Sequence, residues 1–97
     1  MFVKYPWLRL NTVLKFLGEI EKENVSKVAR SERGFLTHYR KYGYAEKMKQ
    51  MIVPGKNRTW EEQRKLFIDR VLPAYQAHPT YRRYLSLIAW GFDANRK

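Results

Sequence analysis

Apolar residues recur at three- and four-residue steps in the first quarter of the chain, with mostly polar positions between them. This spacing places the apolar side chains on one side of an α-helix. Pro6 suits a first helical turn, so the pattern predicts a helix over about residues 6–23. Alternating apolar positions within residues 8–16 would also fit a strand, but the length of the segment favours a helix. The apolar stripe consists of Leu10, Val13, Leu14, Leu17 and Ile20.

Residues 25–42 separate into an apolar side and a basic side when they are placed on a helix. Asn24 or Ser26 is expected to cap this helix, and Gly43 to end it in the left-handed conformation. We expect one helix, at most bent at Gly34. A helix-turn-helix is the alternative, but no apolar anchor stands in the residues directly before that glycine. The apolar side consists of Val25, Val28, Phe35, Leu36, Tyr39 and Tyr42.

A short helix is expected over residues 44–52, followed by a loop that Pro54-Gly55 opens. Thr59 and Glu62 then have the spacing of a capping box, in which each residue satisfies a backbone N–H of the other. They predict the start of a third main helix.

Pro73 is expected to kink or end this third helix, because proline lacks the N–H that continues the hydrogen-bond pattern. The last helix is expected to start after His78, with Thr80 or His78 as its cap. Its apolar residues again follow three- and four-residue steps; they are Tyr81, Tyr84, Leu85 and Ile88.

Together these segments predict an all-α fold, a compact single domain of four to five helices over residues 1–97 with a frayed tail at about 93–97. The composition is 44% hydrophobic and 15% aromatic, which is too apolar for a disordered basic tail. Aromatic residues at helical spacing are expected in the core. These are Phe35, Tyr39, Trp60, Phe67, Tyr84 and Trp90.

The chain contains no cysteine, which excludes disulfides, thiolate metal sites and cysteine nucleophiles. This fits a reducing compartment, and we expect a cytoplasmic protein. No apolar run approaches the roughly 18 residues that span a bilayer, so integral membrane association is not expected. The N-terminal segment lacks the long apolar core of a signal peptide.

The net charge of +11 predicts attraction to a polyanion. Residues 27–58 hold most of the excess, with nine Lys or Arg residues against two Glu residues. The basic side of the expected central helix would form a continuous ridge, suited to phosphates or to a DNA major groove. A helix face that is only solvated usually mixes both signs of charge, so we expect nucleic-acid binding, with DNA favoured over RNA. The candidate binding residues are Lys27, Arg30, Arg33, Thr37, Arg40, Lys41, Lys56, Arg58, Arg82 and Arg83.

Arg82 and Arg83 fall in the first turn of the expected last helix, where a cation is unfavourable with the helix dipole. A phosphate at that helix end would relieve the conflict. The alternative is that both arginines pair with acidic residues of another helix. Tyr44, Tyr81 and Tyr5 are the candidates for exposed stacking on bases.

Two groups of residues carry a resemblance that covers about residues 28–90. The first group is Val28-Ala29-Arg30-Ser31, Arg33-Gly34-Phe35-Leu36, Tyr39 and Gly43; the second is Trp60, Arg64, Phe67-Ile68, Arg70, Pro79-Thr80, Arg82-Arg83, Leu85, Leu87-Ile88 and Trp90. The combination resembles small, largely uncharacterised basic proteins and domains of phages and large DNA viruses. Tyr81 departs from that pattern, because it separates Thr80 from the arginine pair. The resemblance implies a viral or mobile-element setting inside a host cell, and no mechanism.

No pattern in the sequence predicts an enzyme. His38 and His78 are the only histidines and lie far apart, so a metal site is not predicted. Asp69 and Asp93 are isolated in the sequence, and the loop at 54–58 lacks the glycines of a phosphate-binding loop. We therefore expect no catalytic residue and no cofactor.

Three functions remain, in this order. The first is a nucleic-acid-binding protein held by phosphate contacts. The second is a phage-encoded inhibitor or adaptor that uses the same basic side to bind a host protein that handles nucleic acid. The third is peripheral binding to an anionic membrane through residues 1–17, which mix basic and apolar side chains.

Overall fold

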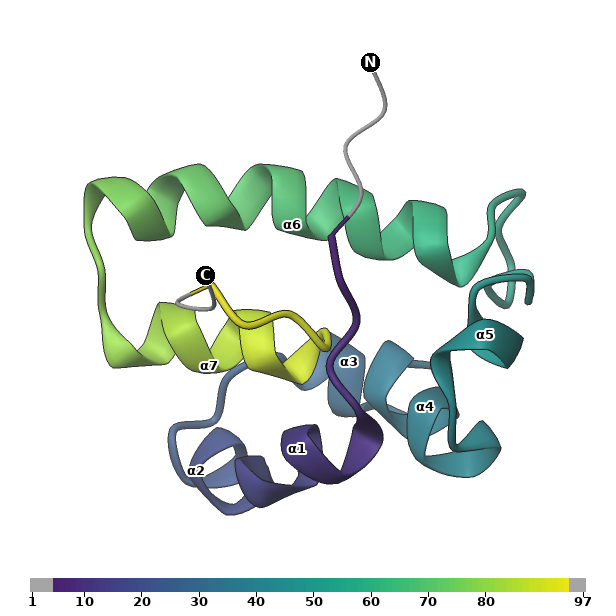
Figure 1. The fold of residues 1–97 in the computed structure, drawn as a ribbon, viewed down its shortest axis with the longest axis horizontal. Coiled ribbons are helices and arrows are strands. Elements are labelled where there is room, and N and C mark those ends of the chain that lie inside the picture. The colour runs from purple at the N-terminus through teal and green to yellow at the C-terminus, as the bar shows by residue number, and fades with distance from the viewer. Residues whose placement is uncertain (1–4, 95–97) are drawn as a thin grey trace.

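The computed structural model describes residues 5–94, and Figure 1 shows their arrangement. The predicted all-α class is confirmed: the described residues contain no strand, only an isolated β-bridge between Ile52 and Thr59. The helices are α1 (Leu10–Lys15), α2 (Leu17–Lys22), α3 (Lys27–Arg30), α4 (Phe35–Tyr42), α5 (Ala45–Met48), α6 (Trp60–Ala77) and α7 (Tyr81–Ala89). Two of the five predicted helices are therefore each divided in two, and the short one is shorter than predicted.

The longest helix, α6, lies along one edge of the molecule, and α7 turns back beside it (Figure 1). The predicted capping box is confirmed: the Thr59 hydroxyl accepts from the Glu62 N–H at 3.3 Å, and the Glu62 carboxylate accepts from the Thr59 N–H at 3.0 Å. Thr80 caps α7 by accepting from the Arg83 N–H at 3.2 Å. His78, the other candidate cap, is instead the C-cap residue of α6.

Pro73 was predicted to kink or end the helix, and α6 does not end there. The helix continues to Ala77. Proline removes one backbone hydrogen bond, but Leu72 and Tyr75 are partly buried on either side of it. Packing of these neighbours holds the helix together across the missing bond.

The predicted helix over residues 6–23 is wrong in its first turn and at its middle. Residues 5–9 are not helical and run from beside α6, past the end of α7, to α1 (Figure 1). Phe16 then separates α1 from α2. Val13 in α1 and Ile20 in α2 are both fully buried, so each half contributes to the core.

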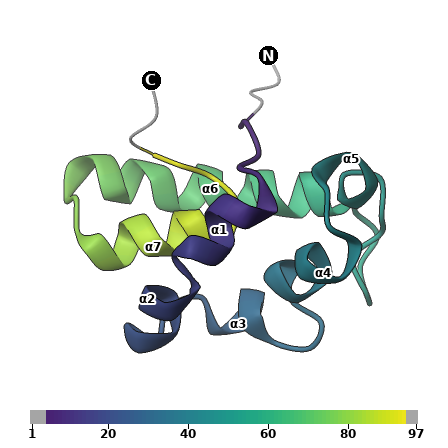
Figure 2. The same ribbon diagram turned by 60° about the horizontal axis from the view of Figure 1, so that its bottom comes forward.

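The predicted single helix over residues 25–42 is also wrong, because residues 31–34 form a turn between α3 and α4 (Figure 2). Gly34 explains this turn. A Cβ at Gly34 would lie 2.0 Å from the Val28 carbonyl oxygen and 2.4 Å from that of Ala29. Glycine therefore permits the close approach of the turn to the end of α3, and the helix-turn-helix alternative describes the path of the chain.

Side chains satisfy the carbonyl groups at the end of α3. The Thr37 hydroxyl lies 3.2 Å from the Arg30 carbonyl oxygen and 2.7 Å from that of Ser31. The Ser31 hydroxyl donates to the Val28 carbonyl at 2.6 Å. These contacts replace the backbone hydrogen bonds that a continuous helix would make.

Ser26 is the N-cap residue of α3, as one of the two predicted alternatives, but its side chain does not make the predicted capping hydrogen bond. Asn24 and Ser26 are both left-handed, with φ of 54° and 55°, whereas a capping residue is normally extended. The Asn24 side chain accepts instead from Arg30 at 3.1 Å. Gly43 ends α4 as predicted, with a φ of 86°.

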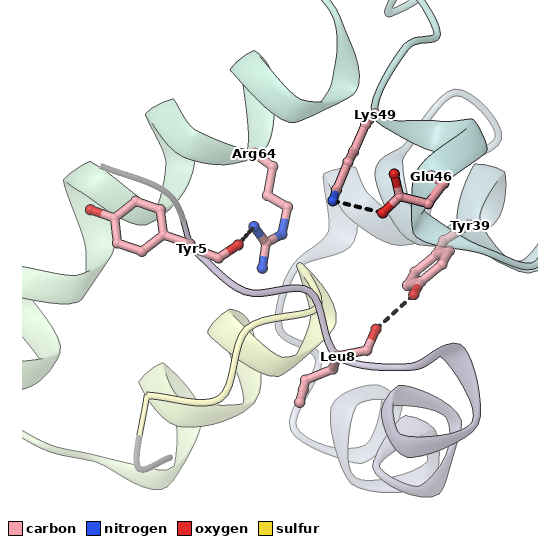
Figure 3. A network of polar contacts seen from close by, with 6 residues as sticks. All are labelled: Tyr5, Leu8, Tyr39, Glu46, Lys49 and Arg64. Carbon is pink, nitrogen blue, oxygen red and sulfur yellow. Dashed lines mark hydrogen bonds and ion pairs between the residues drawn. The ribbon is translucent and has the colours of Figure 1, made fainter. Parts of the chain in front are cut away.

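A buried arginine joins residues 5–6 to α6 and to the end of α7 (Figure 3). Arg64 is 2% exposed, and its guanidinium lies 4.7 Å from the Trp7 ring centroid. Burial lowers the pKa of Arg64 to about 9, so the group remains charged at neutral pH. Its four hydrogen-bond acceptors are the backbone carbonyls of Tyr5, Pro6, Trp90 and Gly91, at 2.6–2.9 Å.

The same N-terminal segment is held at Leu8. Its N–H donates to the Gly91 carbonyl at 2.7 Å, and its carbonyl accepts from the Tyr39 hydroxyl at 2.6 Å (Figure 3). Burial raises the pKa of Tyr39, which keeps the donor protonated. Tertiary partners thus take the backbone groups that a first helical turn would have used.

One hydrophobic core receives residues from all seven helices. Phe35 lies within it, with its ring centroid 4.9 Å from that of Trp90 and 5.8 Å from that of Trp60. The predicted aromatic core is confirmed, since Phe35, Tyr39, Trp60 and Trp90 are buried, and Phe67 and Tyr84 pack against them.

No helix within residues 5–94 is long and apolar enough to cross a membrane. The segment considered for membrane-surface binding, residues 1–17, begins outside the described residues. The tail expected to fray lies outside them from residue 95 onward, and within them Asp93 accepts from the Tyr84 hydroxyl at 3.2 Å.

Candidate nucleic-acid interface

A groove of about 460 Å³ lies between α3 and α6. One face of α6 forms its first side, because Gln63, Leu66, Phe67 and Arg70 recur at the spacing of a single helical face. The start of α3 forms the other side. We call this feature the basic groove; it is lined by Ser26, Lys27, Val28, Ala29, Arg58, Gln63, Leu66, Phe67, Arg70 and Trp90.

Three cations line the basic groove, and its lining residues include no Asp or Glu. Within residues 5–94, the Lys27 side chain makes no hydrogen bond or ion pair, and the Arg70 guanidinium lies 5.8 Å from the Phe67 ring centroid. Arg58 donates to the Gln63 side chain at 3.2 Å. Like charges around one concavity concentrate a positive potential there.

The groove also contains apolar surface. Val28 is 75% exposed and Leu66 is 52% exposed, and the Phe67 ring stacks on Trp90 with centroids 4.6 Å apart. The prediction that Val28 lies in the core is wrong. The single turn of α3 buries Ala29 beneath Gly34 and leaves Val28 beside the groove.

The continuous basic ridge predicted on residues 25–42 is absent, because the turn divides it. Arg30 is partly buried, and its Nε donates to the Val25 carbonyl at 3.0 Å. Thr37 is bound to carbonyl groups at the end of α3. These two candidate binding residues therefore make hydrogen bonds that stabilise the fold.

Other predicted cations are exposed outside the groove. The side chains of Arg33, Arg40 and Lys56 make no hydrogen bond or ion pair in the described part of the chain. Lys41 and the neighbouring Lys47 both contact the Tyr42 ring, at 5.5 and 5.2 Å from its centroid. These residues add positive charge without enclosing a site.

The start of α4 differs from that of a DNA-reading helix. Phe35 is 0% exposed and Leu36 is 1% exposed, whereas a recognition helix presents its N-terminal residues to base edges. The N-terminal end of α4, which a helix-turn-helix protein would insert into DNA, is therefore packed in the core.

Arg82 and Arg83 each bind a backbone carbonyl, which was not predicted from the sequence. Arg82 donates to the backbone carbonyl of Glu23 at the end of α2, and Arg83 to that of His78 at the end of α6, the latter at 2.6 Å. Cations are favourable at helix C-termini. The hydrogen bonds found for their side chains thus go to carbonyls, and neither a phosphate nor an acidic side chain is needed to explain them.

Two of the three candidate stacking residues are exposed. Tyr44 is 62% exposed and Tyr81 51%, although Tyr81 stacks on Tyr84 with centroids 6.4 Å apart. Tyr5 instead donates to Asp69. Burial, and then this hydrogen bond, raises the pKa of Tyr5 to about 12.

The acidic residues and histidines within residues 5–94 form no group of three that could hold a metal ion. Asp69, isolated in the sequence, accepts from Lys65 at 2.5 Å, and this contact lowers the pKa of the carboxyl. His38 packs against Trp60, with ring centroids 5.1 Å apart, and its Nδ1 lies 2.9 Å from the Gly34 carbonyl oxygen.

Of the groove residues, Lys27 and Arg58 were predicted from the sequence as binding residues, whereas Arg70, Leu66 and Gln63 were not. The sequence signal that groups these three residues is a second stripe on α6, offset from the buried stripe that contains Trp60 and Ile68. A single exposed apolar residue such as Leu66 is common on protein surfaces, so this stripe alone does not identify a site.

Comparisons of the chain with protein-family models, with curated proteins and with solved structures gave no match.

Proposed function

We propose that the protein binds nucleic acid through the basic groove. The observation that carries this proposal is the grouping of Lys27, Arg58 and Arg70 around one concavity whose lining has no carboxylate. Phosphate groups are the natural partners of such a set, because binding them releases condensed counterions. The excess charge of the whole chain, +11, would attract the polyanion over a longer range.

The test is a salt titration of binding to DNA and RNA with the variant Lys27→Ala/Arg58→Ala/Arg70→Ala. The affinity of the unmodified protein should fall steeply with salt, with a slope of roughly 0.9 per phosphate neutralised on duplex DNA. The variant should bind more weakly, and its slope should be shallower by about two to three if each cation contacts one phosphate.

A matched control is Arg9→Ala/Lys15→Ala/Lys22→Ala, which removes the same charge from exposed positions outside the groove lining. Equal losses in the two variants would show that net charge alone drives binding, and the groove assignment would be wrong. Binding of an acidic protein without binding of DNA or RNA would favour the protein-partner alternative.

A further inference from the structure

The basic groove has more apolar surface than phosphate binding requires. Phosphates need donors and positive charge, which Lys27, Arg58 and Arg70 supply. Val28 and Leu66 add two largely exposed aliphatic side chains to the same concavity. Phe67 and Trp90 add a stacked aromatic pair. Apolar side chains gathered with cations in one hollow suit a ligand that has both a flat apolar part and an anionic part.

We infer that the groove binds single-stranded nucleic acid, with one unpaired base against Val28, Leu66 and Phe67 and the adjacent phosphates at Lys27, Arg58 and Arg70. This inference rests on the proposed function and adds the state of the strand. The volume of about 460 Å³ lies in the range of pockets for small ligands. Arg70 lies over the Phe67 ring, so its planar guanidinium is held beside the apolar wall, where a base can contact it by a cation–π interaction.

A duplex does not fit this description. Its bases are stacked and paired, so it would offer only phosphates and sugars to a concave site unless a base were flipped out at a cost of a few kcal/mol. An unpaired strand presents its bases without that cost.

Polar groups in the groove can bind the edge of a base. The Gln63 side-chain oxygen already accepts from Arg58, and its amide nitrogen makes no hydrogen bond within residues 5–94. The Ser26 hydroxyl lies 3.5 Å from the Ser86 carbonyl oxygen and keeps its acceptor capacity. An amide donor beside an apolar wall suits the carbonyl oxygens of thymine and uracil.

The test compares four labelled ligands of equal length by fluorescence anisotropy at one salt concentration: oligothymidylate, oligouridylate, a fully abasic DNA strand and a DNA duplex. The abasic strand keeps the phosphates and removes the bases. In the variant Val28→Ser/Leu66→Ser, affinity for oligothymidylate or oligouridylate should fall about tenfold, as expected for loss of one base contact. Affinity for the abasic strand and the duplex should not change, and the two base-bearing strands distinguish DNA from RNA as the source.

Ile52→Ser is the matched control, because Ile52 is 60% exposed and does not line the groove; it should leave all four affinities unchanged. Equal affinities of the unmodified protein for oligothymidylate, oligouridylate and the abasic strand would overturn the inference and leave the proposed function standing. An equal loss on all four ligands in the double variant would also overturn it. Absence of binding to every ligand would instead reject the proposed function and the inference with it.

Discussion

Two sides of α6 use arginine in opposite ways. On one side Arg64 is 2% exposed and donates to four backbone carbonyls. On the groove side Arg70 is exposed, and its contact within the described residues is with the face of Phe67. The two residues lie less than two helical turns apart. The comparison teaches that the surroundings of a cation, and not its residue type, decide whether it stabilises the fold or remains accessible to a ligand.

The same division separates the other basic residues. Arg30, Arg82 and Arg83 donate to backbone carbonyls. The acceptors are those of Val25, Glu23 and His78, respectively. Lys27 and Arg33 make no such bonds in the part of the chain that the structure describes. Substitution of the arginines that donate to carbonyls should lower the free energy of unfolding. Substitution of Lys27 or Arg33 should leave it nearly unchanged.

The largest expected effect is that of Arg64→Met. It would leave the carbonyl groups of Tyr5, Pro6 and Trp90 without their donor, at roughly 1–3 kcal/mol for each that remains buried and unpaired, whereas the Gly91 carbonyl keeps the Leu8 N–H. We expect a loss of about 4 kcal/mol or more in the free energy of unfolding, measured by urea denaturation. Arg70→Met is the matched control and should change that free energy by less than about 0.5 kcal/mol. Similar losses in both variants would remove the distinction between the two sides of α6.

The next effect is that of Gly34→Ala. The added Cβ would overlap carbonyl oxygens of α3, so the turn must shift and displace Lys27 and Val28 from the groove. We expect a loss of about 3 kcal/mol, the upper end for overpacking, together with weaker nucleic-acid binding.

Gly18→Ala provides the control for Gly34→Ala. Nothing lies within 4 Å of a Cβ at Gly18, which is exposed in α2. Alanine should therefore stabilise the protein by about 0.5–1 kcal/mol. Equal effects at the two glycines, measured by thermal unfolding, would contradict the close approach at the turn.

The smallest expected effect is the difference between Arg30→Ala and Arg33→Ala. Both arginines were predicted from the sequence to lie on the same basic helix face. Arg30 donates to the Val25 carbonyl and to the Asn24 side chain from a partly buried position. Its removal should cost about 1 kcal/mol, whereas Arg33→Ala should stay within about 0.5 kcal/mol of the unmodified protein. Urea denaturation measures both, and a larger loss for Arg33→Ala would invert the assignment.

Local patterns predicted the elements whose causes are local. The Thr59–Glu62 capping box, the Thr80 cap and the left-handed Gly43 each depend on residues within a few positions. The buried aromatic residues also followed from helical spacing. The class of the fold could therefore be predicted from the sequence.

The rest depends on contacts between residues far apart in the chain. The start of the first predicted helix is lost because Arg64 donates to the carbonyls of residues 5–6 and the Leu8 N–H donates to the Gly91 carbonyl. The need for Gly34 comes from the approach of its turn to the end of α3, which helical periodicity does not encode. Only Lys27 and Arg58 of the groove were predicted. Its other side, which includes Leu66 and Arg70, lies on α6, and the sequence does not show that α6 lies beside α3.

The hydrogen bonds of Arg64 also set when folding can finish during synthesis. Their acceptors come from residues 5–6 and 90–91, on both sides of the donor in the sequence. The guanidinium therefore cannot complete its set of partners until residue 91 has left the ribosome. Until then the Arg64 guanidinium stays hydrated on α6. Its hydrogen bonds link residues 5–6 to residues 90–91 and so close a long loop, which is expected to form late in folding. The core around Arg64 is thus expected to be completed only after this segment has been translated.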